Sequence, residues 1–349
     1  MRSEPHVLDQ TRSRSRSRHD GSHCLRRNAL TRAETKGSRK RALRLFNVHV
    51  VLLGTAAGGG FPQWNCWCPT CRTARSAPHR ASRRSQSSAA VSVDGERWFL
   101  LNASPDVREQ LGCLPGPIPT QIRHVAVAGI VATDAELDHT LGIVLLREAR
   151  HLQLYATHAV RRILEQDSRI LPVTQAFAQV EVTEMELETQ VPLRYRDGKA
   201  SGISVMPFAV PAGPPRFATE HGAGHTVGLI LQDEVSGGSC AYVPGCGELD
   251  RPLLERLEET DLLLFDGTFW TDDELISLGI GDRRAREMDH QPISGPGGSL
   301  AQLTGLSRPT KVYTHINNTN PMLLQGSPER EQVERAGVAV GHDGMSFSI

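Results

Sequence analysis

A tight cluster of three cysteines constrains the fold of this 349-residue chain more than any other feature. An apolar run over 48–53 predicts a strand, and the glycine-rich segment 54–60 after it predicts a sharp turn. Cys66, Cys68 and Cys71 follow in a C-x-C-x-x-C pattern. Thiolates at this spacing can converge on one metal ion, and structural tetrahedral sites with thiolate ligands favour zinc. The pattern therefore predicts a structural zinc site after the first strand.

Two other interpretations of these cysteines are open. They can be free buried thiols, although three cysteines so closely spaced are rare by accident. They can also form a disulfide, but bridges within so short a segment are strained, and nothing else in the chain indicates an oxidising compartment. Cys240 and Cys246 lie on or just after an expected strand, where we expect small core residues.

The first 44 residues have a different composition from the rest. They hold 13 Lys and Arg against 4 Asp and Glu, and segment 12–18 alternates arginine with serine. Such a segment has little to bury, so we expect a disordered basic tail, either an extension or the product of a wrongly assigned start codon. Nucleic-acid or membrane binding is the functional alternative. An export signal needs an apolar stretch after the charges, and none occurs here.

Residues 45–349 are expected to form one domain. With 26 Lys and Arg against 35 Asp and Glu, this part is mildly acidic and gives no sign of a nucleic-acid surface. No segment approaches the roughly 20 apolar residues needed to cross a bilayer. We therefore expect a soluble, cytoplasmic protein with no membrane insertion.

Short strands and helices alternate from residue 45 to the end. Strands are predicted at 48–53, 89–93, 98–101, 124–133, 152–156, 203–210, 225–231, 239–243, 262–265, 311–314, 338–340 and 345–347. Helices are predicted from 104–106 onward, up to 146, behind 152–156, at 251–258 and at 328–336. Two such halves predict an α/β fold in which sheet packs on sheet and helices cover both faces. The Gly- and Pro-rich segments 211–224 and 279–299 are expected to be binding loops or lids.

Ionisable residues stand where three of the predicted apolar strands end. Asp138 and His139 follow one strand, Asp266 ends another, and His315 comes directly after a third. His290 lies in a loop rich in glycine. Each residue alone is commonly a helix cap or a satisfied core residue, but carboxylates and imidazoles gathered at one edge of a core suit a metal of intermediate hardness.

These motifs carry a family resemblance. Segment 133–139 resembles the T-H-x-H-x-D-H motif of metallo-β-lactamase-fold hydrolases, with Asp134 and Glu136 in place of its two early histidines. A more specific resemblance is to the pyrroloquinoline quinone (PQQ) biosynthesis protein B family. It runs from about residue 48 to the C-terminus and rests on five motifs in order, at 58–66, 102–106, 266–270, 294–298 and 315–321.

The resemblance implies a metallo-β-lactamase-like αββα sandwich of two mixed sheets, with helices on both outer faces. It also implies a role in making the redox cofactor PQQ from the glutamate and tyrosine of a precursor peptide. Two activities are described for such a family: a carrier that moves PQQ or its precursor toward the periplasm, and an iron- and oxygen-dependent hydroxylase acting on the tyrosine ring of a Glu-Tyr intermediate. The implied partners are that substrate, PQQ and other proteins of the pathway.

The residues favour the hydroxylase over a metal-dependent hydrolase. A binuclear hydrolase needs two metals that share an activated hydroxide. Here Asp134 and Glu136 replace the histidines of one site, and segment 244–247 lacks the carboxylate that would bridge two metals. Asp138, His139 and His315 remain, and two histidines with one carboxylate suit non-haem Fe(II) with open positions.

Two further assignments come from the resemblance. His290 and Asp266 resemble residues that shuttle protons in hydrolytic relatives, and here we expect them to act in catalysis or to bind the metal directly. In a phosphodiesterase relative a histidine completes the cysteine site, but Asn318 stands at that position here. His79, Asp106, Cys113 and His124 then remain open as the fourth zinc ligand.

Overall fold

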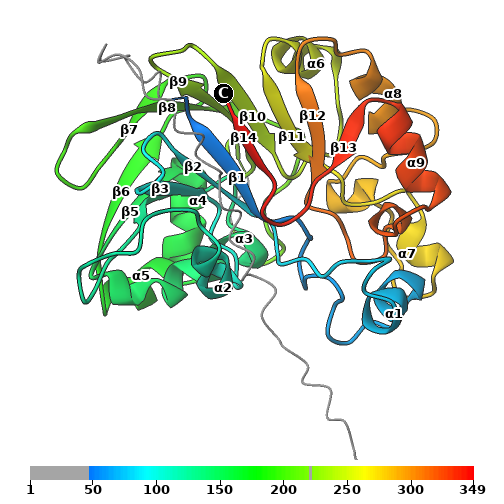
Figure 1. The fold of residues 1–349 in the computed structure, drawn as a ribbon, viewed down its shortest axis with the longest axis horizontal. Helices are drawn as coiled ribbons and strands as arrows, with labels where there is room; N and C mark the ends of the chain where they lie inside the picture. The colour runs from blue at the N-terminus through cyan, green and yellow to red at the C-terminus, as the bar shows by residue number, and fades with distance from the viewer. Residues whose placement is uncertain (1–46, 220–221) are drawn as a thin grey trace, which may run out of the picture. The chain divides into compact units, whose positions relative to one another are not determined.

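Two seven-stranded sheets form the centre of the fold (Figure 1). The computed structural model describes residues 47–219 and 222–349, so the tail expected at 1–44 lies outside the described residues. The first sheet, in pairing order, contains β14 (Ser346–Ser348), β1 (His49–Gly54), β2 (Ser88–Ser92), β3 (Trp98–Leu101), β4 (Val127–Val131), β5 (His151–Thr157) and β6 (Gln179–Met185). The second contains β13 (Val338–Val340), β12 (Thr310–Thr314), β11 (Leu262–Asp266), β10 (Ser239–Val243), β9 (Val227–Asp233), β8 (Ala200–Ala209) and β7 (Val191–Arg194).

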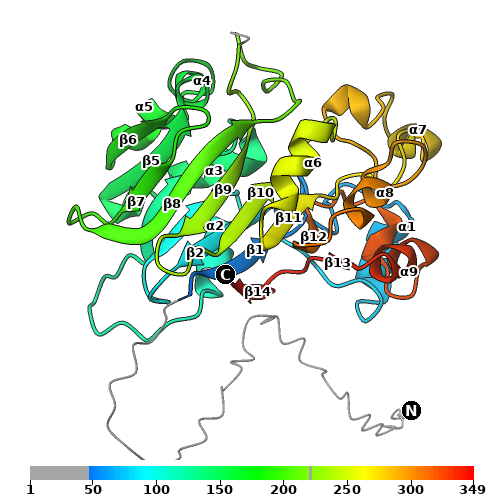
Figure 2. The ribbon, with the colours of Figure 1, turned by 90° about the horizontal axis from the view of Figure 1, so that it is seen from above.

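Helices cover the outer faces of both sheets, as Figure 2 shows. On the first sheet lie α2 (Val107–Gly112), α3 (Leu137–Leu145), α4 (His158–Arg162) and α5 (Ile170–Gln175). On the second lie α1 (Pro69–Ser76), α6 (Arg251–Glu258), α8 (Ser299–Thr304) and α9 (Pro328–Arg335). The short helix α7 (Glu274–Ser277), 3₁₀ turns at Arg147–Ala149, Arg286–Met288 and Pro321–Leu323, and a π-helical turn at Ile163–Asp167 lie in the connections. Among the described residues, no helix is both long and apolar enough to cross a membrane.

The side chains of β11 show how the layers hold together. Leu262 and Leu264 point into the core between the two sheets, whereas Leu263 and Phe265 pack against the outer helices. Both faces of the strand are buried, so its sequence is a continuous apolar run without alternation. The expected αββα sandwich is confirmed.

Each sheet is half antiparallel and half parallel. In the first sheet β3, β4, β5 and β6 run parallel, and in the second sheet β10, β11, β12 and β13 do. Parallel strands place their carboxyl ends at one edge, where open α/β sheets bind ligands. The polar residues that follow β4, β11 and β12 therefore come from the edges of two different sheets.

Several elements differ from the expectation, among them the unpredicted short helices α7 and α8. β6 and β7 were not predicted, because both are edge strands with partly exposed, polar faces and no apolar run. Charges on such edges, here Glu181 and Glu184, limit pairing with other chains. Cys71 lies in a helix that was not predicted, since α1 begins at Pro69, where proline is well tolerated.

Candidate metal centre

The site lies where the ends of strands from both sheets meet. After β4, the chain crosses to α3, which carries Asp138 and His139 in its first turn. After β12, the next residue is His315. The packing of one sheet on the other therefore brings together residues 176 positions apart in sequence.

The structure brings Asp138, His139 and His315 within coordinating distance of one ion. Oδ2 of Asp138 lies 3.5 Å from Nε2 of His315 and 4.0 Å from Nε2 of His139. The two imidazole rings are 5.1 Å apart between centroids. One ligand atom from each residue lies within 4.8 Å of the others.

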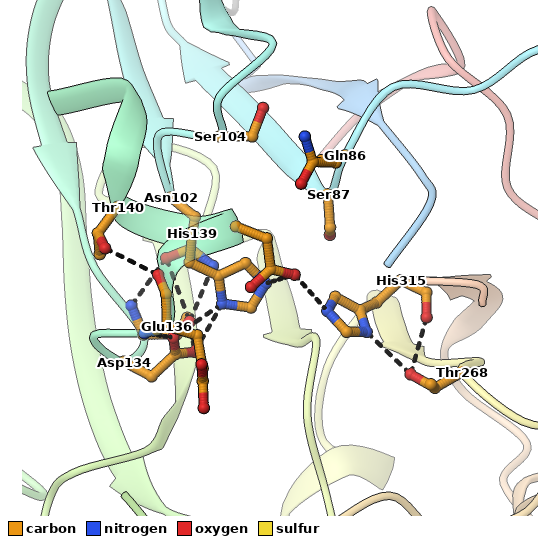
Figure 3. Close-up of polar contacts among 12 residues, drawn as sticks. Gln86, Ser87, Asn102, Ser104, Asp134, Glu136, His139, Thr140, Thr268 and His315 are labelled. Atoms are coloured by element: carbon orange, nitrogen blue, oxygen red, sulfur yellow. Dashed lines mark hydrogen bonds and ion pairs between the residues drawn. The ribbon is translucent and has the colours of Figure 1, made fainter. Parts of the chain in front are cut away.

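His139 is oriented by Asp134 (Figure 3). Nδ1 of His139 lies 2.8 and 2.9 Å from the two carboxylate oxygens of Asp134. Asp134 also accepts hydrogen bonds from the Thr133 hydroxyl at 2.7 Å and the Glu136 amide at 2.9 Å. Burial alone would lower the pKa of His139, but the charges of Asp134 and Asp138 outweigh burial and raise it to about 9. The two contacts with Asp134 place a proton on Nδ1, and Nε2 faces the site.

Thr268 orients His315 in the same way (Figure 3). Its hydroxyl lies 2.8 Å from Nδ1 of His315 and 2.5 Å from Oδ1 of Asp266. A hydroxyl has one proton, so donation to Asp266 leaves Thr268 to accept the Nδ1 proton of His315. His315 also has a φ of 53°, a left-handed conformation that costs a non-glycine residue about 1–3 kcal/mol. Strain of this kind is found mainly where side-chain direction matters for function.

His290 and Asp266 form a second pair beside the first. Nδ1 of His290 lies 2.7 Å from Oδ2 of Asp266, and the His290 ring stacks on His315 with 5.3 Å between centroids. Asp266 is fully buried, and its oxygens also accept hydrogen bonds from the Cys246 amide and from Thr268. Burial would lower the pKa of His290, but the charge of Asp266 outweighs it and raises this pKa. Asp266 therefore fixes His290 directly and His315 through Thr268.

The donor set fits a divalent metal ion. Nε2 of His139 is buried and has no hydrogen-bond partner among the described residues, a costly state for a polar atom unless something binds it. Burial would raise the pKa of Asp138, but His139 and His315 outweigh burial and lower it, so this residue offers an ionised carboxylate to a metal. Metal-bound histidines typically donate their second ring N–H to a carboxylate or other acceptor, as both histidines do here.

A cleft of about 630 Å³ opens over these residues. Its floor includes Asp138, His139, His290 and His315, and its walls come from both predicted loops, 211–224 and 279–299. The volume is in the range of small-molecule sites. The arrangement leaves room for a substrate beside the metal position.

The three cysteines converge at a separate site. The sulfurs of Cys66, Cys68 and Cys71 lie within 4.8 Å of one another. A hydrogen bond from the Cys71 thiol lowers the pKa of Cys68, so the cluster holds a thiolate at neutral pH. The backbone carbonyl oxygen of Asn318 lies 3.7 Å from the Cys68 sulfur and 3.9 Å from the Cys71 sulfur. Ligands of a tetrahedral zinc with bonds of about 2.0–2.3 Å are separated by similar distances.

The residues left open as a fourth ligand are not at this site. Among the residues that the structure describes, no further His, Cys, Asp or Glu joins the three thiols. This excludes His79, Asp106, Cys113 and His124. Asn318 lies beside the thiols instead, and its side-chain nitrogen is 3.3 Å from the Cys71 sulfur. The sequence argument failed because it considered only side chains that commonly bind zinc.

A short segment links the two sites. His315 faces the metal position, Asn317 lines the cleft, and Asn318 faces the thiols. The Asn317 amide and the Asn320 side chain both donate to the backbone oxygen of Thr268, at 3.0 and 3.3 Å. Because Thr268 also contacts His315, the segment that faces the cysteines is hydrogen-bonded to the residue that orients His315.

Asp134 and Thr268 are functional residues that the sequence argument missed. Asp134 was noted only as the replacement of a metal-binding histidine, and Thr268 only as part of a motif. The signal for Asp134 was its position five residues before His139, but the contact depends on the turn between β4 and α3.

Comparison with known proteins gives the family. Residues 97–316 match the family described as beta-lactamase superfamily domain. Coenzyme PQQ synthesis protein B of Gluconacetobacter diazotrophicus is 40% identical over 312 residues, which cover 86% of this chain and 99% of the relative. The chain belongs to the coenzyme PQQ synthesis protein B family. The member from Pseudomonas aeruginosa is 39% identical over 319 residues and is covered completely. The resemblance inferred from the motifs is confirmed.

Solved structures agree with this assignment. A crystal structure of Zn²⁺-bound PqqB from Methylobacterium extorquens matches with a TM-score of 0.77 and 36% identity, covering 86% of this chain and all of that one. A diphosphatase from the PhnP family matches with a TM-score of 0.60 at 21% identity, covering 86% and 98%, which supports the fold alone.

Replacing Asp134 by Asn tests the orienting role of this carboxylate. The neutral amide of the variant cannot hold the Nδ1 proton of His139 by charge, so we expect affinity for a divalent metal to fall by about 10–100-fold. Calorimetric titration of metal-free protein with Fe²⁺ or Zn²⁺ measures this. The matched control is Asp197→Asn, on an exposed turn, which should bind as the wild type does. Unchanged affinity in Asp134→Asn would contradict the role.

Replacing Cys71 by Ser tests the link between the sites. We expect loss of the zinc held by the cysteines, and weaker metal binding at His315, because Asn318 and its neighbours lose their anchor. Metal content per chain and Fe²⁺ titration measure the two effects. Cys240→Ala removes a buried thiol outside the cluster and should keep its zinc. Full zinc content in Cys71→Ser would show that this thiol is not a ligand.

Proposed function

We propose that this protein is an iron- and oxygen-dependent hydroxylase that acts on the tyrosine ring of a Glu-Tyr-derived precursor in PQQ synthesis. Family membership supports the pathway. The observation that carries the reaction is the convergence of His139, His315 and Asp138, with an unpartnered Nε2 on a buried histidine of the described chain. Two histidines and one carboxylate on one side of a metal leave positions open for oxygen and substrate.

Ferrous iron at this position would supply the redox chemistry that activates dioxygen, which no amino-acid side chain provides. The residues of the chain have other tasks. Asp134 and Thr268 hold the Nδ1 protons of His139 and His315, so that each Nε2 is free to bind. Asp266 holds Nδ1 of His290, and the ring of His290 lines the cleft, where it can take a proton from the phenol.

Hydrolysis with two metals has less support. Asp134 stands where such enzymes have a histidine ligand, and both of its oxygens are hydrogen-bonded to His139 or its neighbours. Among the described residues, two overlapping groups could hold a metal: Asp138, His139 and His315, and Asp266, His290 and His315. Neither group includes Asp134 or Glu136, and the two share His315. Asp266 is already hydrogen-bonded to His290, which favours the first group as the metal position.

The direct test is oxygen exposure of iron-loaded protein. Protein loaded with Fe²⁺ without air is mixed with a Glu-Tyr substrate and then with oxygen, and the catechol product is followed by mass spectrometry. We expect catechol with iron and none with zinc, which has no redox chemistry. His139→Ala should lower the yield by more than about 100-fold, since loss of an outer partner alone costs 10–100-fold. A carrier would bind PQQ and form no catechol, and that result would overturn the proposal.

His290→Ala separates a proton-transferring residue from a metal ligand. If His290 moves a proton, the variant keeps its full iron content and loses about 10²–10⁴-fold in rate. Iron content per chain, measured beside the rate, gives the answer. His158→Ala, on an exposed helix start, should change neither quantity. Loss of iron from His290→Ala would instead make it a ligand.

A further inference from the structure

Two arginines line the cleft without a close polar partner among the described residues. Arg216 lies in the loop between β8 and β9, and Arg283 lies in the segment after α7. Among the described residues, neither forms a hydrogen bond or an ion pair. Arg216 is near enough to Glu136 to favour its ionised form, although burial and the charges of Asp134 and Asp138 raise the pKa of Glu136 to about 7.

The neighbours of Arg283 are different. Arg284 forms an ion pair with Asp272 at 3.6 Å, and Arg286 donates to the backbone oxygen of Gly297 at 3.2 Å. Neither of these two lines the cleft. Of the three arginines in this described segment, Arg283 alone lines the cleft, and it alone has no hydrogen bond or ion pair.

The backbones that carry both arginines are held in place. Gly213 donates to Oδ2 of Asp289 at 3.1 Å, which ties the first loop to the second. Thr219 donates to Asp167 from its hydroxyl at 2.8 Å, which fixes the other side of Arg216. The amide of buried Ala285 donates to Asp272, which fixes the chain beside Arg283. Two guanidinium groups without hydrogen bonds, carried by backbones that are held in place, are well positioned to bind a ligand.

The rest of the cleft shows which end of a ligand goes where. Leu137 and Leu141 lie one turn apart on α3, line the cleft and are partly exposed, as an apolar wall. The floor holds the carboxylate and imidazoles of the metal position. The two arginines attract the anionic groups of a substrate, and the apolar wall suits its ring.

We propose that Arg216 and Arg283 bind two carboxylates of the substrate and so direct its ring toward the metal position. A guanidinium matches a carboxylate with two parallel hydrogen bonds, which fix orientation as well as charge. The substrate class is then an aromatic compound with at least two carboxylates. This inference rests on the proposed function for the identity of the ring chemistry, but the binding of carboxylates can be measured without turnover.

The test is binding to zinc-loaded protein, which cannot turn over. The probes are the dipeptide Glu-Tyr and its C-terminal amide, which lacks one carboxylate. We expect Arg216→Gln and Arg283→Gln each to raise the Kd for Glu-Tyr by roughly tenfold or more, as for a lost charged hydrogen bond. The control Arg284→Gln, whose side chain is outside the cleft, should bind normally. Melting temperature and metal content confirm that each variant is folded.

The amide probe adds a second comparison. It should bind more weakly to the wild type, and one of the two variants should show no further loss with it, because the partner carboxylate is already gone. Equal Kd values in all variants, or no measurable binding by the wild type, would overturn the inference. Arginine-dependent binding without catechol formation would support carboxylate binding by the arginines and contradict the hydroxylase proposal. Normal hydroxylation with unchanged KM in the double variant would support the hydroxylase proposal and contradict carboxylate binding by the arginines.

Discussion

The approach of His139 to His315 depends on how the two sheets pack. One residue lies in the first turn of a helix on the first sheet, and the other follows a strand of the second. Neither sheet alone holds both histidines. The core between them, with fully buried Phe99, Tyr242 and Leu264, therefore acts on the metal position directly, since protein interiors transmit small displacements instead of absorbing them.

Buried carboxylates make the metal position favour a bound cation. Asp134, Asp138 and Asp266 are all held ionised around imidazoles, although burial opposes their charge. In the absence of a cation, the carboxylates favour protonated histidines, and a bound divalent ion replaces those protons. Metal binding at such a site releases protons and is therefore favoured as pH rises. The fixed Nδ1 partners keep each ring oriented in both states, so that binding requires little rearrangement.

The sequence was informative where residues act through local patterns. The apolar runs of β10, β11 and β12 and the helix at Arg251–Glu258 were predicted nearly to the residue, because buried strands and a capped amphipathic helix leave a strong pattern. The edge strands β6 and β7 leave only a weak pattern, with few apolar residues. The positions of Asp138, His139 and His315 at strand ends could be predicted, but the bonds from Asp134 and Thr268 could not, since they depend on turn geometry. The backbone carbonyl of Asn318 has no sequence signature at all.

Asp134 stands where hydrolases of this fold have a metal-binding histidine, and this replacement changes what the site can do. A histidine at its position would be free to bind a metal, whereas a carboxylate there meets the Nδ1 proton of His139 and forms a short bond. A position that would supply a ligand to one metal site thus supplies a carboxylate that orients His139 at the other site. A hydroxide shared between two ions requires both sites, while oxygen activation requires one metal with open positions. The substitution thus removes a ligand of the first arrangement and supports the single-metal reaction that we propose, because an anchored imidazole is the better ligand.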